Sequence, residues 1–318
     1  MEQGLSEEAQ VGIQEIVEAR IREFVDATFE TISGSANNDP IPDTVFHYTT
    51  AEGLLGIVRN RELWATHISY LNDKIEFIYA FRLLAAEAGK RFDSRQESLD
   101  TAGQFLALLT RDAPHRVFDD VYVACFCHEK DSLNHWRAYG RGSGFAIEIN
   151  LTTGDKSSSL KPGNTGKASL GQVLYDRRRQ TQLISRVIDH CVTFIESWGD
   201  TSKEAANSSA ISLASFIHVV VAILASKLKH PAFSSECEWR MVCSPHERIA
   251  PTRPDFRSSA GLVVPYLPLK AAEGEKLPIK AVWCGPTSEV NLSIRSAEML
   301  LNRYGYDVPI KSSELSLR

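Results

Sequence analysis

Three ionisable residues at alternate positions, Glu236, Glu238 and Arg240, are the strongest chemical signal in this sequence of 318 residues. Side chains alternate between the two faces of a β-strand, so this spacing places two carboxylates and one guanidinium on the same face. The intervening Cys237 and Trp239 are apolar and suit a core. Neighbouring carboxylates perturb each other's pKa, and such groups gather at functional sites. The pattern predicts a catalytic or binding strand, and a salt-bridged surface strand is the alternative.

A second candidate is the segment His47-Tyr48-Thr49, which ends an expected strand over residues 44–49. Thr49 and Glu52 have the spacing of a capping box, so a helix is expected to begin directly after this strand. This order places the His47 imidazole at the end of a strand, a common position for ligand contacts. A structural histidine is the alternative.

Two aromatic residues, Trp136 and Tyr139, lie three positions apart in a short expected helix over residues 132–139. Residues with this spacing share one helix face. The two rings form either an aromatic wall for a planar ligand or part of the core.

Composition indicates an ordinary folded protein, with 43% hydrophobic and 24% charged residues. The net charge of -5 argues against a protein that coats duplex nucleic acid. The six cysteines include no C-x-x-C pair, so neither a disulfide framework nor a zinc site is expected. The polar N-terminus shows no signal-peptide pattern, and the longest apolar stretch, residues 211–224, is too short to span a bilayer. We therefore expect a cytoplasmic protein without a membrane partner.

The arrangement of expected elements favours the α+β class, because strands and helices are mixed without strict alternation. Strands are predicted over residues 44–49, 62–66, 121–127, 144–149, 173–175, 236–243, 262–266, 279–284 and 308–310. Helices are predicted over residues 7–32, 50–60, 72–88, 99–109, 132–139, 180–198, 203–228 and 288–304. Residues 1–40 then form a helical appendage that packs on the main fold or on a partner protein. Residues 41–318 form a single domain with a helical insertion at about 178–230.

Several of these segments together resemble the ADP-ribosyltransferase fold. The resemblance rests on His47-Tyr48-Thr49, on Glu62-Leu63-Trp64 after a helix, and on the late Glu236-Cys237-Glu238. The chain also resembles a bacterial family of uncharacterised proteins, through H-Y-T at His47, N-D-x-x-E-F at Asn72, W-x-x-Y-G at Trp136, the strand from Gly144, and E-x-E-W-R at Glu236. The first resemblance implies a mixed sheet core, into which the long helices before Glu236 are inserted.

The transferase resemblance also implies roles for individual residues and NAD as the substrate, with no metal. Glu238 would stabilise the oxocarbenium-like state formed when the nicotinamide–ribose bond breaks, and Glu236 would activate the acceptor. His47 would hold the adenosine ribose, with Tyr48 and Thr49 beside it. Trp136 or Tyr139 would stack on nicotinamide, since no Ser-Thr-Ser segment is present to fill that place. Arg240 would contact a phosphate or restrain Glu236. The protein would be a toxin or anti-phage effector that modifies a protein or nucleic acid, or a hydrolase of NAD without an acceptor.

Two other functions fit the same residues. Asp73 and Glu76, with Glu236 and Glu238, are candidate ligands for Mg²⁺ in a nuclease, although Asp73 and Glu76 also have the spacing of a helix cap. Alternatively, the chain is a non-catalytic binding module or antitoxin that holds its partner through the same cleft and the N-terminal helix.

Overall fold

The computed structural model describes residues 19–20, 23–24, 26–29, 31–32, 41–71, 74–93, 121–141, 143–151, 160–162, 167–197, 220–244, 253–259 and 261–315. These residues form a mixed α+β structure, as predicted. The chain divides into two compact units. Residues 1–36, 72–119 and 174–231 belong to a helical unit, and residues 37–71, 120–173 and 232–318 belong to a sheet unit.

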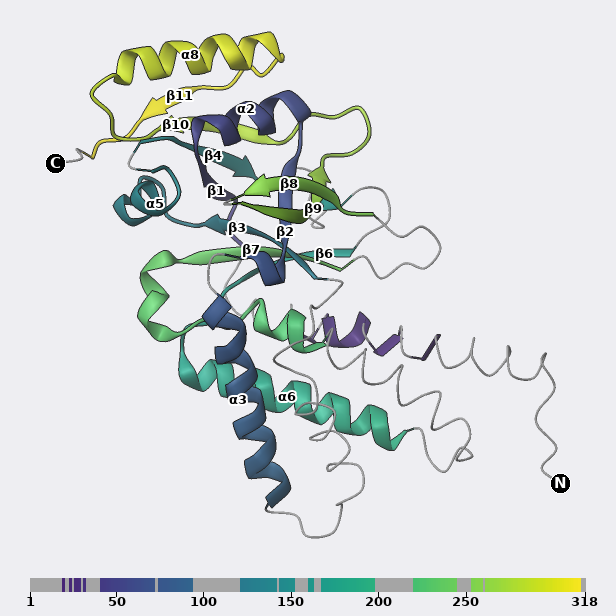
Figure 1. The fold of residues 1–318 in the computed structure, drawn as a ribbon. Coiled ribbons are helices and arrows are strands. Elements are labelled where there is room, and N and C mark those ends of the chain that lie inside the picture. Colours follow the sequence, from purple (N-terminus) through teal and green to yellow (C-terminus); the bar gives the residue numbers. More distant parts are fainter. Residues whose placement is uncertain are drawn as a thin grey trace, which may run out of the picture. The chain divides into compact units, whose positions relative to one another are not determined.

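An 11-stranded sheet organises the sheet unit (Figure 1). Its strands are β1 (Thr44–Thr49), β2 (Leu63–His67), β3 (Tyr122–Cys127), β4 (Phe145–Asn150), β5 (Lys161–Pro162), β6 (Lys167–Gln172), β7 (Glu238–Ser244), β8 (Asp255–Ser259), β9 (Leu262–Lys270), β10 (Ile279–Cys284) and β11 (Ile310–Ser312). The main order is β11-β10-β4-β1-β3-β2-β9-β5, while β7 pairs with β3 and β6, and β8 pairs with β9. The pair β10–β11 is parallel, and the other strand pairs are antiparallel.

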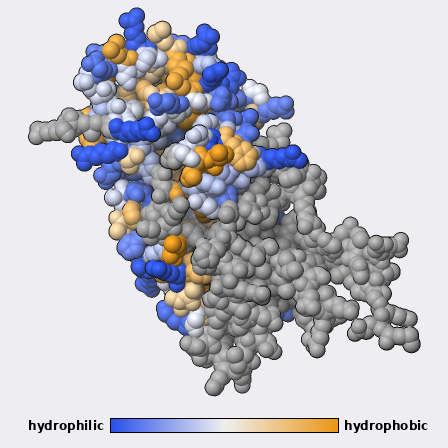
Figure 2. Space-filling view, viewed as in Figure 1, coloured by the Kyte–Doolittle hydropathy of each residue, from blue (hydrophilic) through white to orange (hydrophobic). Residues whose placement is uncertain are grey.

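Helices α2 (Ala51–Asn60) and α8 (Val290–Arg303) pack on one face of this sheet (Figure 1). Apolar residues of both helices, such as Leu54 and Leu301, join a buried core with inward-facing strand residues such as Ile147 and Met241. The outer surfaces of these helices are not uniformly polar. Figure 2 shows hydrophobic atoms interspersed with hydrophilic ones on the visible face of the molecule.

The short helix α5 (Leu133–Ala138) lies over the opposite face. Its Trp136 is fully buried against Phe46, Ala146 and Trp283, in a second apolar cluster. This cluster explains why Gly285 must lack a side chain, because a Cβ there would lie 2.8 Å from the Trp136 ring. Two 3-10 helices, η1 (Ile68–Tyr70) and η2 (Pro231–Glu236), complete the connections near this face.

The helical unit contains α3 (Lys74–Asp93) and α6 (Arg177–Glu196), which are joined by an ion pair between Arg91 and Asp189. N-terminal residues pack on α6 within this unit. The ring of Phe24 stacks on His190 and Phe194, with centroid distances of 4.6 and 4.1 Å. Among the described helices, none is long and apolar enough to cross a bilayer.

Most predicted elements are confirmed within one or two residues. Larger shifts occur at the ends of β9 and α3 and at the start of α6, β5 was not predicted, and α2, β6 and β8 differ as follows. Thr50 rather than Thr49 caps α2, since its Oγ1 accepts a hydrogen bond from the Gly53 amide at 3.3 Å. The strand expected at residues 173–175 lies earlier, as β6. Strand β8 was not predicted, because its exposed edge position leaves no alternating apolar pattern. The expected helix over 99–109 and most of the one over 203–228 fall outside the described residues.

Candidate functional site

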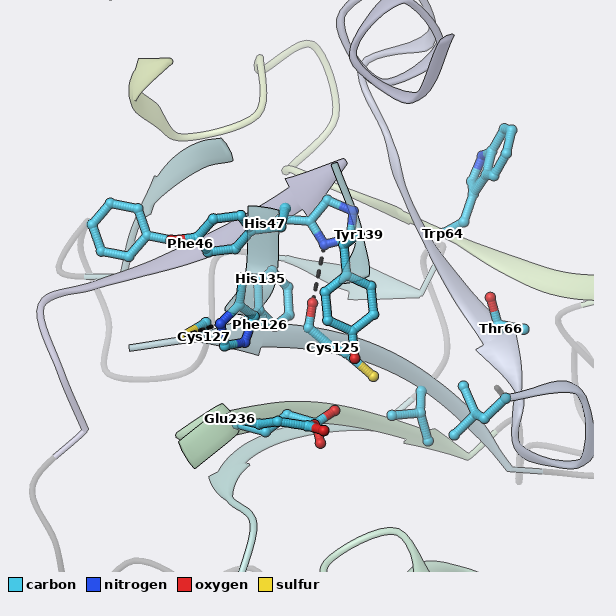
Figure 3. Close-up of a pocket in the computed structure, with 14 residues that line it drawn as sticks. Phe46, His47, Trp64, Thr66, Cys125, Phe126, Cys127, His135, Tyr139 and Glu236 are labelled. Atoms are coloured by element: carbon cyan, nitrogen blue, oxygen red, sulfur yellow. Dashed lines mark hydrogen bonds between the residues drawn. The ribbon is translucent and has the colours of Figure 1, made fainter. Parts of the chain in front are cut away.

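A pocket lies in the sheet unit where strand pairing is interrupted along one edge of β3 (Figure 3). β3 pairs with β1 only at Phe46↔Cys127, and with β2 only from Thr66↔Val123 to His67↔Tyr122. Between these points β1 and β2 diverge, whereas β7 follows the other edge of β3 over six residue pairs. The pocket opens in this gap and is lined by Phe46, His47, Tyr48, Trp64, Thr66, Leu71, Val123, Cys125, Phe126, Cys127, His135, Tyr139, Glu236 and Glu238.

The His47 side chain bridges the gap between β1 and β3 (Figure 3). Its Nδ1 lies 3.0 Å from the carbonyl oxygen of Cys125, and a carbonyl can only accept, so Nδ1 carries the proton. Burial lowers the pKa of His47, and the hydrogen bond to Cys125 opposes this effect only in part. The imidazole is therefore neutral at pH 7. Its Nε2 then offers a lone pair, for which the described residues supply no donor.

Glu238 and Arg240 form a buried ion pair on the pocket face of β7. Arg240 donates from Nε to Oε1 and from Nη2 to Oε2 of Glu238, both at 2.8 Å. The two residues are only 4% and 3% exposed. A bidentate pair of this kind fixes the plane of the carboxylate. The bidentate partner of Arg240 is thus Glu238, and a restraint of Glu236 by Arg240 stays a prediction.

Glu236 does not share a strand with Glu238, contrary to the prediction. It ends η2, and Cys237 has a left-handed backbone with φ of 44° that separates it from β7. This conformation costs a non-glycine residue about 1–2 kcal/mol. Hydrogen bonds from the Cys237 amide to Ser234 and from the His128 amide to Cys237 hold the turn in place. The predicted alternation begins at Glu238, yet Glu236 still lines the same pocket.

The aromatic residues of the predicted wall have separate positions. Tyr139 lines the pocket and stacks on His135, with ring centroids 5.8 Å apart. Trp136 is instead fully buried, and its Nε1 donates to Asp131 Oδ1 at 2.8 Å. Since a core residue cannot stack on a ligand, the aromatic wall consists of Tyr139 and not Trp136.

Tyr48 and Thr49 also differ in position. The Tyr48 hydroxyl accepts from the Ser132 amide at 2.9 Å and donates to the Glu129 carbonyl at 3.1 Å, so this pocket residue also anchors the loop before α5. Burial raises the pKa of Tyr48, which keeps the hydroxyl protonated. Thr49 is not among the lining residues, because its hydroxyl lies against Gly53 at the start of α2.

Sequence analysis missed several lining residues, above all Trp64, His135 and Cys127. The Cys127 Sγ lies 3.8 Å from His135 Nδ1, but burial raises the pKa of this thiol to about 12. It is therefore protonated at neutral pH and is not an activated nucleophile. Trp64 belongs to the Glu62-Leu63-Trp64 segment named above. A large aromatic residue in this expected strand was the signal that could have identified it as a pocket residue.

The loop that carries α5 is fastened by Asp131. Its Oδ1 accepts from Trp136 Nε1 and from the Ser313 hydroxyl, and its Oδ2 accepts from the Glu314 amide at 2.8 Å. Asp131 itself has a left-handed backbone, with φ of 56°. One carboxylate thus joins α5 to the segment that follows β11.

The pocket encloses about 170 Å³, below the roughly 300–1,000 Å³ of usual small-ligand sites. It fits one ring system with a polar substituent, and a larger ligand would extend beyond it. In the part of the chain that the structure describes, no three His, Cys, Asp or Glu side chains are grouped to hold a metal ion. Asp73 and the side chain of Glu76, which belong to the predicted Mg²⁺ site, fall outside the described residues.

Comparison with known proteins gives one family match. A family described as a protein of unknown function (DUF2971) matches residues 135–241, from α5 to the middle of β7. No curated protein matches the chain. No solved structure matches it either.

Proposed function

We propose that this chain cleaves the nicotinamide–ribose bond of NAD and transfers ADP-ribose to a macromolecule. The observation that carries the proposal is that His47, Tyr139, Glu236 and Glu238 line one pocket although they belong to separate elements. Titratable groups that meet in one pocket beside an aromatic ring are candidates for acid, base and charge-stabilising roles. The mixed sheet, interrupted between β1 and β3, is compatible with the ADP-ribosyltransferase resemblance.

Each pocket group suits a part of this substrate. The oxidised nicotinamide ring is planar and positively charged, so an aromatic side chain and two carboxylates favour its binding. Tyr139 supplies the aromatic face. The neutral His47 supplies Nε2 as an acceptor for a ribose hydroxyl.

Glu238 is the proposed catalytic carboxylate. Departure of nicotinamide leaves positive charge on the ribose, and a fixed negative charge nearby stabilises that transition state. A carboxylate has about four lone-pair positions, so an oxygen that accepts from Arg240 can also accept from the ribose 2′-hydroxyl. Glu236, at the turn outside β7, would take the proton from the attacking acceptor.

This assignment makes a nuclease a weaker explanation of the same residues. Both oxygens of Glu238 accept hydrogen bonds from the Arg240 guanidinium, whose positive charge opposes a metal ion at the same carboxylate. The biological role as a toxin or anti-phage effector in the cytoplasm rests on the family resemblance alone.

The test is nicotinamide release from NAD, measured by chromatography with purified protein, with and without cell lysate. We expect wild type to release nicotinamide, Glu238→Gln to reduce the rate at least about a hundredfold, and the exposed control Glu275→Gln to match wild type. Label from biotinylated NAD appearing on lysate protein or nucleic acid identifies a transferase, and release without labelling identifies a hydrolase.

Two outcomes would contradict the proposal. NAD binding without any release, unaffected by lysate, would favour a binding module. Release that persists in folded Glu238→Gln would remove Glu238 from the mechanism. Tyr139→Ala gives an independent check, because it removes a pocket ring without exposing a buried charge, and should raise KM more than it lowers kcat.

A further inference from the structure

Arg257 of β8 lies beside the pocket and has no part in the proposed chemistry. Its Nη2 donates to the Thr66 hydroxyl at 3.2 Å. Its guanidinium carbon lies 5.7 Å from the centre of the Trp64 ring. Thr66 and Trp64 both line the pocket, so two direct contacts connect Arg257 to the pocket wall.

The hydrogen bonding of Arg257 is incomplete. A guanidinium has five N–H donors in a planar fork. The Nε of Arg257 is buried and has no acceptor, and no carboxylate of the described residues forms an ion pair with this side chain. Burial also lowers the pKa of Arg257, although interaction with Tyr266 opposes this. Arg257 is half-buried, and a buried N–H without an acceptor is unfavourable, a cost that an anion bound at this guanidinium would relieve.

The acidic and aromatic groups around Arg257 have other partners, so a ligand can bind next to its guanidinium. Glu62 is occupied, because Oε1 accepts from Trp64 Nε1 at 3.0 Å and Oε2 pairs with Lys270 at 3.4 Å. The Trp64 ring packs on Tyr266, with centroids 4.6 Å apart, so the aromatic surface next to Arg257 is rigidly supported. The neighbourhood therefore combines a fixed ring with a guanidinium that forms no ion pair with the described carboxylates.

We propose that Arg257, positioned by Thr66 and Trp64, is a binding site for a phosphate group of the ligand that occupies the pocket. A planar guanidinium matches phosphate oxygens in bidentate geometry, which a lysine cannot reproduce. The pocket volume holds only one ring system, so a dinucleotide would continue past its edge. Strand β2 forms one such edge, where Thr66 accepts a hydrogen bond from Arg257. The identification of this group as the diphosphate of NAD rests on the proposed function, whereas phosphate binding by Arg257 does not.

The test is isothermal titration of the full chain with inorganic pyrophosphate, at low and high salt. We expect wild type to bind, and Arg257→Gln to bind about ten- to a hundredfold more weakly. The control Arg253→Gln removes the same charge from an exposed residue just before β8, and should change the affinity less than about threefold. Affinity in wild type should fall as salt rises.

Wild type that does not bind pyrophosphate, or Arg257→Gln that binds like wild type, overturns the inference. If Arg257→Gln does not fold, Arg257→Lys serves instead: it keeps the charge and loses Nε, so weaker binding supports the inference and unchanged binding overturns it. A different result would contradict the proposed function. Pyrophosphate binding that depends on Arg257, with no nicotinamide release from NAD, supports the phosphate site and contradicts the transferase.

Discussion

The buried pair of Glu238 and Arg240 permits a quantitative test, because either side chain left alone would be a buried charge. The residues are 4% and 3% exposed and are joined by two hydrogen bonds of 2.8 Å. Removing one partner of a buried pair costs about 3–5 kcal/mol, whereas replacing both by apolar groups of similar volume is often neutral. We expect Glu238→Gln and Arg240→Met each to lose about 3–5 kcal/mol of unfolding free energy. The double variant should lose much less than the sum of these two values.

Urea unfolding followed by tryptophan fluorescence measures these differences. Four of the five tryptophans, Trp64, Trp136, Trp239 and Trp283, belong to the sheet unit, so the emission reports mainly on the unit that contains the pair. The exposed Glu275→Gln is the control and should stay within about 0.5 kcal/mol of wild type. A loss below about 1 kcal/mol in both single variants, the size typical of exposed pairs, would refute the argument that this pair is buried and mutually dependent. The double variant should fold but release no nicotinamide, which separates stability from chemistry.

Three further predictions concern packing and pH. Gly285→Ala should destabilise the protein by about 1–3 kcal/mol, because its Cβ would lie 2.8 Å from the Trp136 ring. Gly56→Ala in α2 should stabilise the protein by up to about 1 kcal/mol, because its Cβ would meet open space. Thermal unfolding of both variants compares these effects. Burial opposes ionisation of Glu148, but hydrogen bonds from Trp283 and Lys280 and the charges of two lysines outweigh it and lower the pKa of Glu148. The ionised Glu148 then contributes fully to stability above the ordinary pKa of about 4.5, and this contribution is lost as the pH falls through the lower pKa of the folded state. Glu148→Gln should remove this dependence when the unfolding free energy is measured at decreasing pH. The lowered pKa of His47 means that the unfolded chain binds a proton first as the pH falls below 6.5, so stability should decline from there to the folded pKa; an unchanged acid slope in His47→Asn would contradict this.

The strands that carry the site could be predicted where their side chains alternate. β1, which carries His47, has the predicted bounds, because it buries apolar residues such as Val45 in the α2–α8 core. The same holds for β10, which lies outside the pocket. Strand β8 could not be predicted from such a pattern, since its residues are mostly exposed, and Arg257 was missed with it.

The site itself was predicted in part, for reasons that depend on single residues. Glu238 and His47 were found through their positions in strands. The backbone turn at Cys237 left no signal in the sequence, because a left-handed cysteine is rare, and so Glu236 was placed on the wrong element. Trp136 and Tyr139 share a helix face by spacing, but helical spacing does not tell which of two rings meets the core.

The hydrogen bonds of the Asp131 carboxylate with the segment after β11 bear on the order of folding. Asp131 accepts from Ser313 and Glu314, residues 182 and 183 positions later in the chain. Contacts between such distant residues form late, because the entropy of closing the intervening loop must be overcome first. The Tyr48 hydroxyl bonds the same loop at Glu129 and Ser132, which lie only 81 and 84 positions away from it. During synthesis, Tyr48 can therefore hold the loop that leads to Tyr139 before the contacts of Ser313 and Glu314 with Asp131 form.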